Sequence, residues 1–375
     1  MSRFPDKYRL AALPLATLDR LGLAPRPRVP VAYVVERANW SIRWDGAYVA
    51  REIERIAPGT AEIVERVHRL ARRAVHFFSQ YQWEAWGSAL APSNRYAVTF
   101  YHGKPEDDPR MARHIDAFLR SLPRVDRVVT AASLIEERLL AWGVPRDKLV
   151  RIPIAVDLDV FRPAPAAARV RARQRFGVPE GHLAIGSFQK DGVGWGEGDE
   201  PKMIKGPDVL IETIAEVAKK RRVFVLLTGP ARGYVKRGLD RLGIPYTHDF
   251  VDDYETLPER YAALDVYLNP SREEGGPKGI MESMATCVPI VSTRVGMAPD
   301  LIRHRETGFL AEPGDSESLA RAILEIDGDP ALRARITEAG WQAVAVCSAP
   351  VVGRAHWEKV VQPMLQAMGR DKSNA

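Results

Sequence analysis

Apolar residues follow two alternating patterns along the first half of the chain. Short runs of apolar, β-forming residues are followed by segments in which apolar residues recur every three or four positions. The runs lie at residues 29–35, 74–78, 96–100 and 127–130, and helical periodicity marks residues 47–56 and 134–140. A polar, aromatic loop is expected at residues 36–46. This alternation predicts a parallel sheet with helices on both faces.

The second half of the chain repeats the same pattern. Strands are predicted at residues 183–186, 223–227, 266–268 and 289–292, and helices at residues 208–219 and 279–286. The fold class is therefore α/β, with two Rossmann-like, doubly wound parallel-sheet domains. Ligands of such sheets bind beyond the carboxyl ends of the strands, so we expect a central cleft between the two halves.

Proline and aspartate mark the expected boundaries. Residues 153–165 are rich in both and lack periodicity, which predicts the linker between the domains. Residues 1–28 are expected to be an extension in which four prolines, Pro14 among them, prevent a long helix. The N-terminal domain then covers residues 29–160 and the C-terminal domain residues 165–345. A last helix at about 349–368 is expected to cross back to the N-terminal domain.

Composition predicts the cellular compartment, and the charges are unevenly distributed along the chain. The two cysteines, Cys287 and Cys347, cannot build a disulfide framework, and no run of about 18 apolar residues could span a membrane. A cytoplasmic protein is expected. Residues 1–165 hold 26 Lys and Arg against 19 Asp and Glu. This basic half predicts either peripheral contact with an anionic membrane at its inner face or a phosphorylated acceptor, and an ordinary arginine-rich surface is the alternative. The arginines are scattered, so no nucleic-acid partner is expected.

The most informative stretch, residues 269–293, runs from a strand through a glycine-rich loop into a helix and a second strand. Gly275, Gly276 and Gly279 allow close approach of the backbone to a ligand, and a helix N-terminus offers N–H donors to a diphosphate. Glu274 at the loop and Glu282 one turn into the helix can accept hydrogen bonds from vicinal sugar hydroxyls. For two glutamates alone, a helix dipole and a solvated turn would be the preferred explanation. The glycines and the flanking strands favour a binding loop.

This stretch resembles the signature of the retaining glycosyltransferases of family 4, which have the GT-B fold. In that signature two glutamates are separated by seven residues, as Glu274 and Glu282 are here. The matching positions are Pro270, Ser271, Glu274, Glu282, Ala285 and Pro289, and the segments 151–163, 205–210 and 296–308 resemble further elements of the family. The resemblance covers residues 125–325 best.

The resemblance implies a role for each matching residue. Glu282 is expected to bind the donor ribose, and Glu274 to contact the donor sugar near the reacting carbon. Lys205 is expected to neutralise the leaving diphosphate. His102, which ends the segment Phe-Tyr-His, matches a histidine that approaches the sugar, although a histidine that closes a loop is the alternative. The remaining donor-binding residues are Gly275, Gly276, Pro277, Lys278 and Gly279.

The sequence departs from the family pattern at three places. An arginine is expected after the first strand of the second domain, but Ser187 stands there, and Lys190 is the candidate that replaces it. Cys287 occupies a position where glycine is usual. The loop after the first strand of the chain carries tryptophans and charges that suit sugar stacking and phosphate binding, although packing under the loop is the alternative. The candidate acceptor-binding residues there are Trp40, Arg43, Trp44 and Asp45.

These expectations together describe an enzyme. It would move a sugar, with retention, from a nucleoside-diphosphate sugar to a glycan, lipid-linked or small-molecule acceptor, without a cofactor or a metal. The N-terminal domain would bind the acceptor and the C-terminal domain the donor. Two alternatives remain open: a nucleotide-sugar epimerase on the same fold, and a non-catalytic sugar-nucleotide-binding or scaffold protein. The sugar, the base and the acceptor do not follow from the sequence.

Overall fold

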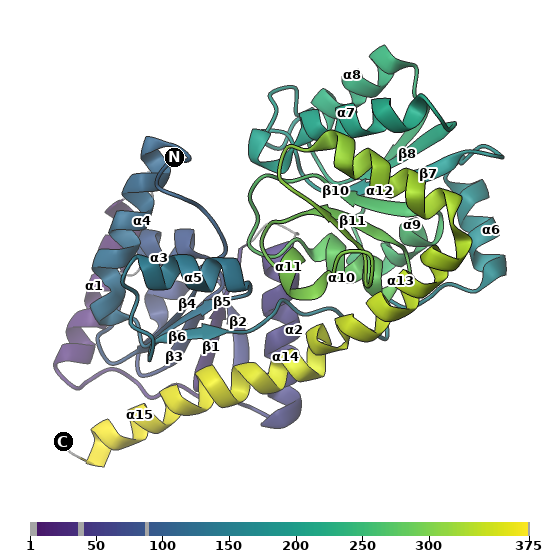
Figure 1. Cartoon of the computed structure of the whole chain (residues 1–375). Coiled ribbons are helices and arrows are strands. Elements are labelled where there is room, and N and C mark those ends of the chain that lie inside the picture. Colours follow the sequence, from purple (N-terminus) through teal and green to yellow (C-terminus); the bar gives the residue numbers. More distant parts are fainter. Residues whose placement is uncertain (1–5, 37–40, 87–89, 374–375) are drawn as a thin grey trace. The chain divides into compact units, whose positions relative to one another are not determined.

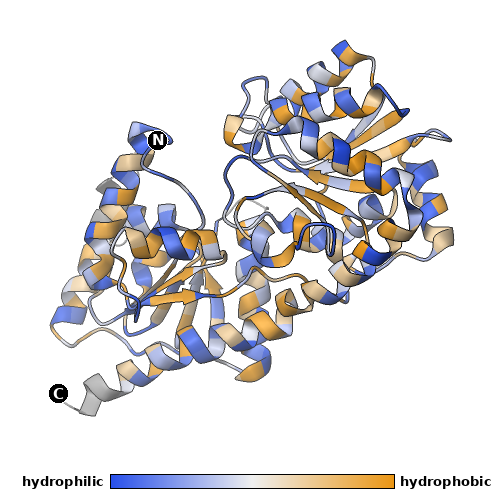
Figure 2. Ribbon diagram, in the orientation of Figure 1, coloured by the Kyte–Doolittle hydropathy of each residue, from blue (hydrophilic) through white to orange (hydrophobic). Residues whose placement is uncertain are grey.

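The computed structural model describes residues 6–36, 41–86 and 90–373. The chain divides into two compact units, which are called unit 1 (Met1–Ala155 with Ala349–Ala375) and unit 2 (Val156–Ser348). Each unit holds one six-stranded parallel sheet with helices packed around it (Figure 1). This arrangement confirms the predicted fold class of two doubly wound parallel sheets. In Figure 2 the strands are mostly orange, whereas orange and blue alternate along the helices.

The sheet of unit 1 has the strand order β2-β1-β3-β4-β5-β6. Its strands are β1 (Val31–Val34), β2 (Ala61–Val64), β3 (Ala74–Phe77), β4 (Arg95–Thr99), β5 (Arg127–Thr130) and β6 (Leu149–Arg151). Its helices before the linker are α1 (Asp6–Arg20), α2 (Ser41–Ile56), α3 (Gln80–Trp86), α4 (Pro109–Ser121) and α5 (Ser133–Ala141). The strands β1, β3 and β4 are buried almost throughout because both faces of the sheet are covered.

Helix α1 contradicts the expectation that prolines prevent a long helix in the first 28 residues. It spans Asp6–Arg20 with Pro14 inside. Tertiary contacts offset the hydrogen bond that a proline removes. Asp19 accepts hydrogen bonds from the backbone N–H and the hydroxyl of Ser93, and the Arg72 guanidinium donates to the carbonyl of Gly22. The segment is therefore part of unit 1 and not a detached extension.

Helix α2 begins at Ser41, inside the segment predicted as a loop. Its residue Gly46 lies so close to Val35, the residue that follows β1, that a Cβ there would be 2.2 Å from Cγ1 of Val35. Only a glycine allows this approach, and the approach brings the first turns of α2 into the packed structure. Trp40 lies outside the described residues.

The end of the chain belongs to unit 1 in the structure. It forms α14 (Ala349–His356), a π-helical turn (Trp357–Val361) and α15 (Gln362–Ser373). Helix α14 packs on α2, and a Cβ on its Gly353 would be 2.2 Å from Cβ of Glu52. The segment is therefore helical where a last helix was expected, with a π-helical turn in its middle (Figure 1).

Two buried histidines meet under α14. His76 on β3 shares a hydrogen bond of 2.9 Å with the hydroxyl of Thr99, and its ring centroid is 5.6 Å from that of His356. The rings of Tyr33 and Phe78 enclose the pair. Burial lowers the pKa of His356 to about 3 and that of His76 well below its usual value, and for His76 the charge of His356 adds to the effect.

Acid is therefore expected to destabilise unit 1. In the unfolded chain both histidines titrate near pH 6.5, whereas in the folded chain they stay neutral, so the unfolded state binds more protons below pH 6.5. The free energy of unfolding should fall by about 1.4 kcal/mol per pH unit for each histidine as the pH drops from 6.5 toward the folded pKa. Urea unfolding between pH 8 and 5 measures this slope. His356→Leu should reduce the slope, and His182→Gln in unit 2 should not. An unchanged slope in His356→Leu would contradict the assignment.

The sheet of unit 2 has the strand order β12-β11-β10-β7-β8-β9. Its strands are β7 (Leu183–Phe188), β8 (Val223–Thr228), β9 (Tyr246–Asp249), β10 (Val266–Asn269), β11 (Ile290–Thr293) and β12 (Phe309–Ala311). Its α-helices are α6 (Ala166–Arg175), α7 (Pro207–Ala218), α8 (Gly233–Leu242), α9 (Pro258–Ala262), α10 (Lys278–Ala285), α11 (Ala298–Leu301), α12 (Ser316–Gly328) and α13 (Pro330–Ala343). The 3₁₀ turns used below are η4 (Met203–Lys205) and η5 (Tyr254–Thr256).

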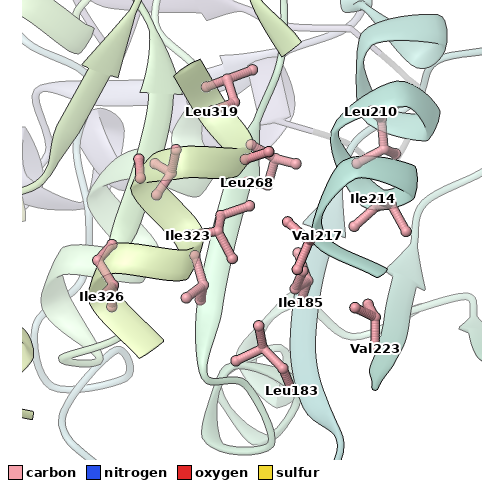
Figure 3. Packing of buried hydrophobic residues seen from close by; sticks show 14 of the residues in the cluster. Leu183, Ile185, Leu210, Ile214, Val217, Val223, Leu268, Leu319, Ile323 and Ile326 are labelled. Carbon is pink, nitrogen blue, oxygen red and sulfur yellow. The ribbon is translucent and has the colours of Figure 1, made fainter. Parts of the chain in front are cut away.

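The core of unit 2 lies between the sheet and the helices α7 and α12. Figure 3 shows Leu210 and Ile214 of α7 and Ile323 of α12 facing Ile185 of β7 and Leu268 of β10. All of these residues are completely buried. Helix α10 instead packs beside α13 and against β10 and β11. No helix among the described residues is long and apolar enough to cross a membrane.

Candidate functional site

The sheet of unit 2 changes direction between β7 and β10. From β7 the chain proceeds to β8 and β9 on one side, and from β10 to β11 and β12 on the other. The segments that follow two such strands part from one another and leave a crevice at the carboxyl edge of the sheet. Here these segments begin at Gln189 and Pro270. The candidate site consists of these two segments together with η4, η5 and the start of α10.

The loop after β10 is fixed to η4. The Arg272 guanidinium forms two hydrogen bonds of 2.7 Å with the Asp208 carboxylate, and its backbone N–H donates to the carbonyl of Ile204 at 2.8 Å. Gly206, with φ of 63°, is so close to this loop that a Cβ would be 2.1 Å from the carbonyl oxygen of Pro270. The loop and the turn therefore form one rigid piece.

This piece brings Lys205 and Glu274 together. The Lys205 ammonium lies 2.7 Å from both carboxylate oxygens of Glu274, and the hydroxyl of Ser271 donates to one of them at 2.9 Å. The Glu274 side chain is 8% exposed and that of Lys205 18%. The two predicted residues, 69 positions apart, are thus a nearly buried ion pair at the crevice. A ligand that carries both hydroxyls and negative charge could use the two partners separately.

Glu282 is held by two tyrosines that the sequence analysis did not single out. The hydroxyl of Tyr261 donates to one carboxylate oxygen at 2.8 Å, and the hydroxyl of Tyr254 donates to the other. Burial, with the Glu282 charge as the next cause, raises the pKa of Tyr261 well above its usual value, so Tyr261 remains a donor. A carboxylate has about four acceptor positions, so two donors leave capacity for ligand hydroxyls. Glu282 itself is 3% exposed.

The start of α10 is packed tightly against Tyr254 and Tyr267. Pro277 precedes the first helical residue, Lys278, whose ammonium lies 5.4 Å from the ring centroid of Tyr254. A Cβ on Gly279 would be 2.1 Å from the hydroxyl of Tyr267. The first N–H groups of an α-helix have no partner within the helix and favour an anion.

The predicted glycines at the loop also have structural reasons. Gly275 touches Gly296, where φ is 50° and a Cβ would be 2.8 Å from the Gly275 carbonyl group. Gly276 lies in the same loop, before Pro277. The cysteine at the usual glycine position, Cys287, adopts φ of 54°, directly after the end of α10. Glycine is the residue that takes this left-handed conformation most easily, which explains the family pattern at this position.

The loop after β7 forms an ordered hairpin, residues 190–201, which is called the β7 hairpin. Gly192 and Pro201 form an antiparallel bridge, and the N–H of Val193 donates to the carbonyl of Glu200 at 2.9 Å. The predicted Lys190 is at its first position, and its ammonium lies 4.0 Å from the ring centroid of Trp195. Lys190 is therefore not in the ion pair of Lys205 and Glu274.

A buried arginine, Arg232, anchors this hairpin. It does not take the place of the arginine that the family pattern has after the first strand of the second domain. The guanidinium of Arg232 donates to the carbonyls of Ser187, Gln189 and Thr228 at 2.6–2.9 Å, and it lies 3.0 Å from the carboxylate of Asp191. Both side chains are 0% exposed. Burial raises the pKa of Asp191, and the charge of Arg232 opposes this rise. The sequence showed no sign of this contact, because Arg232 belongs to no recognisable motif.

The candidate residues of unit 1 lie at the carboxyl edge of its own sheet. His102 follows β4, and its carbonyl accepts a hydrogen bond of 2.9 Å from Gln80. Arg43 and Trp44 are half-buried on the first turns of α2. Asp45 is 4% exposed, and it raises the pKa of Tyr101 in addition to the main effect of burial. Asp45 is thus in the interior and not on an open loop as expected.

Among residues 6–36, 41–86 and 90–373, no group of three or more His, Cys, Asp and Glu side chains is arranged to hold a metal ion.

Known proteins resemble this chain in both sequence and structure. Residues 197–329, within unit 2, match the family described as Glycosyl transferases group 1. The D-inositol 3-phosphate glycosyltransferase of Streptomyces avermitilis is 28% identical over 271 residues, which cover 65% of this chain and 55% of that protein. The GDP-mannose-dependent alpha-(1-6)-phosphatidylinositol monomannoside mannosyltransferase of Mycolicibacterium smegmatis is 27% identical, over 53% of this chain and 52% of that protein.

Two solved structures resemble nearly the whole chain. HepE of Anabaena, in complex with UDP and glucose, has a TM-score of 0.68 and 17% identity, and covers 92% of this chain and 100% of that one. Sucrose-phosphate synthase of Thermosynechococcus elongatus has a TM-score of 0.67 and 18% identity, over 93% and 100%. The fold is therefore GT-B. The chain spans little more than half the length of the two curated relatives.

Proposed function

We propose that the chain is a glycosyltransferase that uses a nucleoside-diphosphate sugar as donor and retains the configuration of the anomeric carbon. The observation that carries the proposal is the ion pair of Lys205 and Glu274 in unit 2, which joins the segments that follow β7 and β10, where the strand order changes direction. Glu282, held by Tyr261, lies on the helix that follows the same β10 segment. Its chemistry suits a ligand with both a diphosphate and vicinal hydroxyls. The group 1 glycosyltransferase match over residues 197–329 supports the same class of reaction.

In this proposal the two carboxylates hold the two sugars of the donor. Glu282 accepts hydrogen bonds from the ribose hydroxyls while Tyr254 and Tyr261 keep its carboxylate in place. Glu274 accepts hydrogen bonds from the hydroxyls of the transferred sugar. Lys205 and the N–H groups around Gly276 to Gly279 receive the diphosphate. Without a donor, the charges of Lys205 and Glu274 neutralise each other. When the donor binds, Lys205 contacts the diphosphate and Glu274 contacts the hydroxyls of the transferred sugar.

In the reaction, one bond of the anomeric carbon is exchanged for another. The bond from this carbon to the diphosphate oxygen breaks, and a bond to the acceptor hydroxyl oxygen forms on the same face of the sugar. The acceptor proton moves to the departing diphosphate. Lys205 stabilises the negative charge that develops on this diphosphate, which is where a fixed cation contributes most. His102 of unit 1 is proposed to approach the donor sugar, as the resemblance implies, and the acceptor is proposed to bind to unit 1.

A donor assay tests the proposal and separates its alternatives. The purified chain is incubated with radiolabelled UDP-glucose or GDP-mannose, the classes of donor that the names of its relatives and neighbours suggest. D-inositol 3-phosphate and a phosphatidylinositol monomannoside serve as acceptor probes. Transfer of the label to an acceptor supports the proposal. A changed sugar still on the nucleotide would indicate an epimerase, and binding of the donor without turnover would indicate a non-catalytic protein.

Glu282→Ala is expected to raise the donor dissociation constant about 100-fold. The variant removes two hydrogen bonds to a charged acceptor, each worth about 1.5 kcal/mol or more. Isothermal titration with UDP and with GDP measures the change in wild type and variant. Glu306→Gln, an exposed glutamate paired with Arg303, is the control and should bind like wild type. If Glu282→Ala also binds like wild type, the ribose assignment is wrong.

A further inference from the structure

The β7 hairpin has a firm base. Beyond the buried pair of Asp191 and Arg232, Glu197 pairs with Lys236 at 3.2 Å, and Asp199 pairs with Arg237. A Cβ on Gly198 would be 2.2 Å from the backbone of Ala231. The backbone N–H groups of Gly233 and Tyr234 donate to hairpin carbonyls at 2.6 and 3.0 Å. Glu197 and Asp199 are therefore paired with cations of α8, and Asp191 is paired with Arg232, which directly precedes that helix.

The tip of the hairpin is different from its base. Trp195 is 57% exposed and Val193 46%. A Cβ on Gly194 or Gly196 would have no atom within 4 Å. The Lys190 ammonium lies over the indole ring of Trp195, a cation–π contact worth about 0.5–1 kcal/mol at an exposed site.

Lys190 also directly follows a residue that contacts η4. The side-chain amide of Gln189 donates to the carbonyl of Lys205 at 2.9 Å, so the backbone that leads into Lys190 is fixed next to the ion pair of Lys205 and Glu274. A lysine carries its charge on a flexible four-carbon stem and can reach different partners from one backbone position. The ammonium thus has two destinations, the indole ring and an anion in the crevice.

We propose that Trp195 is a latch that holds the Lys190 ammonium outside the crevice until an anionic donor enters, when the ammonium moves to the diphosphate. The latch rests on the proposed donor function of unit 2. It regulates the affinity of that site, because breaking the cation–π contact opposes binding. The apparent affinity equals the intrinsic affinity multiplied by the fraction of molecules that hold the competent arrangement.

The latch predicts the direction in which the affinity for UDP changes when Trp195 is replaced. Trp195→Ala removes a competitor for the ammonium, so UDP should bind about two- to fivefold more tightly, the equivalent of the cation–π energy. A stacking surface for the ligand would have the opposite effect, because its loss weakens binding. Lys190→Met should weaken UDP binding about tenfold through the loss of one charged contact. With Lys190→Met already present, Trp195→Ala should change nothing further.

Titration calorimetry of the full chain with UDP and with inorganic pyrophosphate decides between these outcomes. Val193→Ala, at the same exposed tip, and Lys220→Met, an exposed lysine before β8, are the controls and should bind like wild type. Weaker or unchanged binding in Trp195→Ala overturns the latch. An equal effect of Trp195→Ala with and without Lys190 also overturns it. Failure of the wild-type chain to bind any nucleoside diphosphate would overturn the donor assignment, and the latch with it.

A spectroscopic measurement follows the movement directly. The chain holds eight tryptophans, so fluorine-19 spectra of protein labelled with 5-fluorotryptophan give few signals, and Trp195→Phe assigns the relevant one. On addition of UDP the Trp195 signal should move toward its position in ligand-free Lys190→Met. In Lys190→Met the signal should not respond to UDP. A stationary signal in wild-type protein that binds UDP would overturn the latch while the donor function stands.

Discussion

Replacing Lys205 with methionine is expected to lower kcat of sugar transfer about 10²–10³-fold, the usual effect of removing one group that stabilises developing charge. The variant keeps much of the length and apolar stem of the side chain but leaves the diphosphate without its fixed cation. It also leaves the nearly buried Glu274 carboxylate with the Ser271 hydroxyl but without its ammonium partner. Steady-state kinetics with the donor and acceptor that wild type uses give the measurement.

Two further variants separate charge from structure in this experiment. Lys205→Arg should recover part of kcat because the charge returns in a different shape. Lys220→Met removes the same charge from the exposed position before β8 and should leave kcat unchanged. A normal kcat in Lys205→Met would show that the leaving diphosphate is stabilised elsewhere, for example at the start of α10.

The second large effect concerns stability. Arg232→Met is expected to lower the free energy of unfolding of unit 2 by about 3–5 kcal/mol, because the buried Asp191 carboxyl loses its cation and must stay charged in the interior or take up a proton. The carbonyls of Ser187, Gln189 and Thr228 lose their donor at the same time. Urea unfolding at pH 7, followed by circular dichroism, measures the loss.

The double variant Arg232→Met with Asp191→Leu provides the matched control. It removes both charges, and a buried ion pair replaced by apolar side chains often costs little. We therefore expect this variant to regain much of the lost stability. A double variant as unstable as Arg232→Met would mean that the carbonyl contacts, and not the unpaired carboxylate, account for the effect.

The sequence predicted the sheets better than it predicted the contacts around the site. The long apolar runs that became β3, β7 and β8 were located to within two residues, since local pattern decides buried strands. The short strands β6 and β12, three residues each, carry too little pattern to be recognised. Helix α1 was missed because contacts distant in the sequence, such as that of Asp19 with Ser93, offset the cost of its proline.

The candidate site was likewise predicted only in part. Glu274 and Glu282 were predicted from the glycine-rich loop and the helix after it, and Lys205 from the resemblance to a family motif; the structure brings Lys205 and Glu274 into contact. Tyr254 and Tyr261, which hold Glu282, were not found. They are separated from it by 28 and 21 residues, and a tyrosine has many reasons to be buried. A local pattern thus identifies residues that face a ligand more readily than residues that hold them from behind.

The two ends of unit 2 lie beside each other. Val156 and Ser348 form a parallel bridge, and the N–H of Val156 donates to the carbonyl of Cys347 at 2.8 Å. Unit 2 is therefore one continuous stretch of chain inserted into unit 1, whose last helices α14 and α15 are synthesised only after it. During synthesis, all residues of unit 2 are therefore made before unit 1 is complete. The unit that begins the chain has to wait for the last residues before α14 can close over His76.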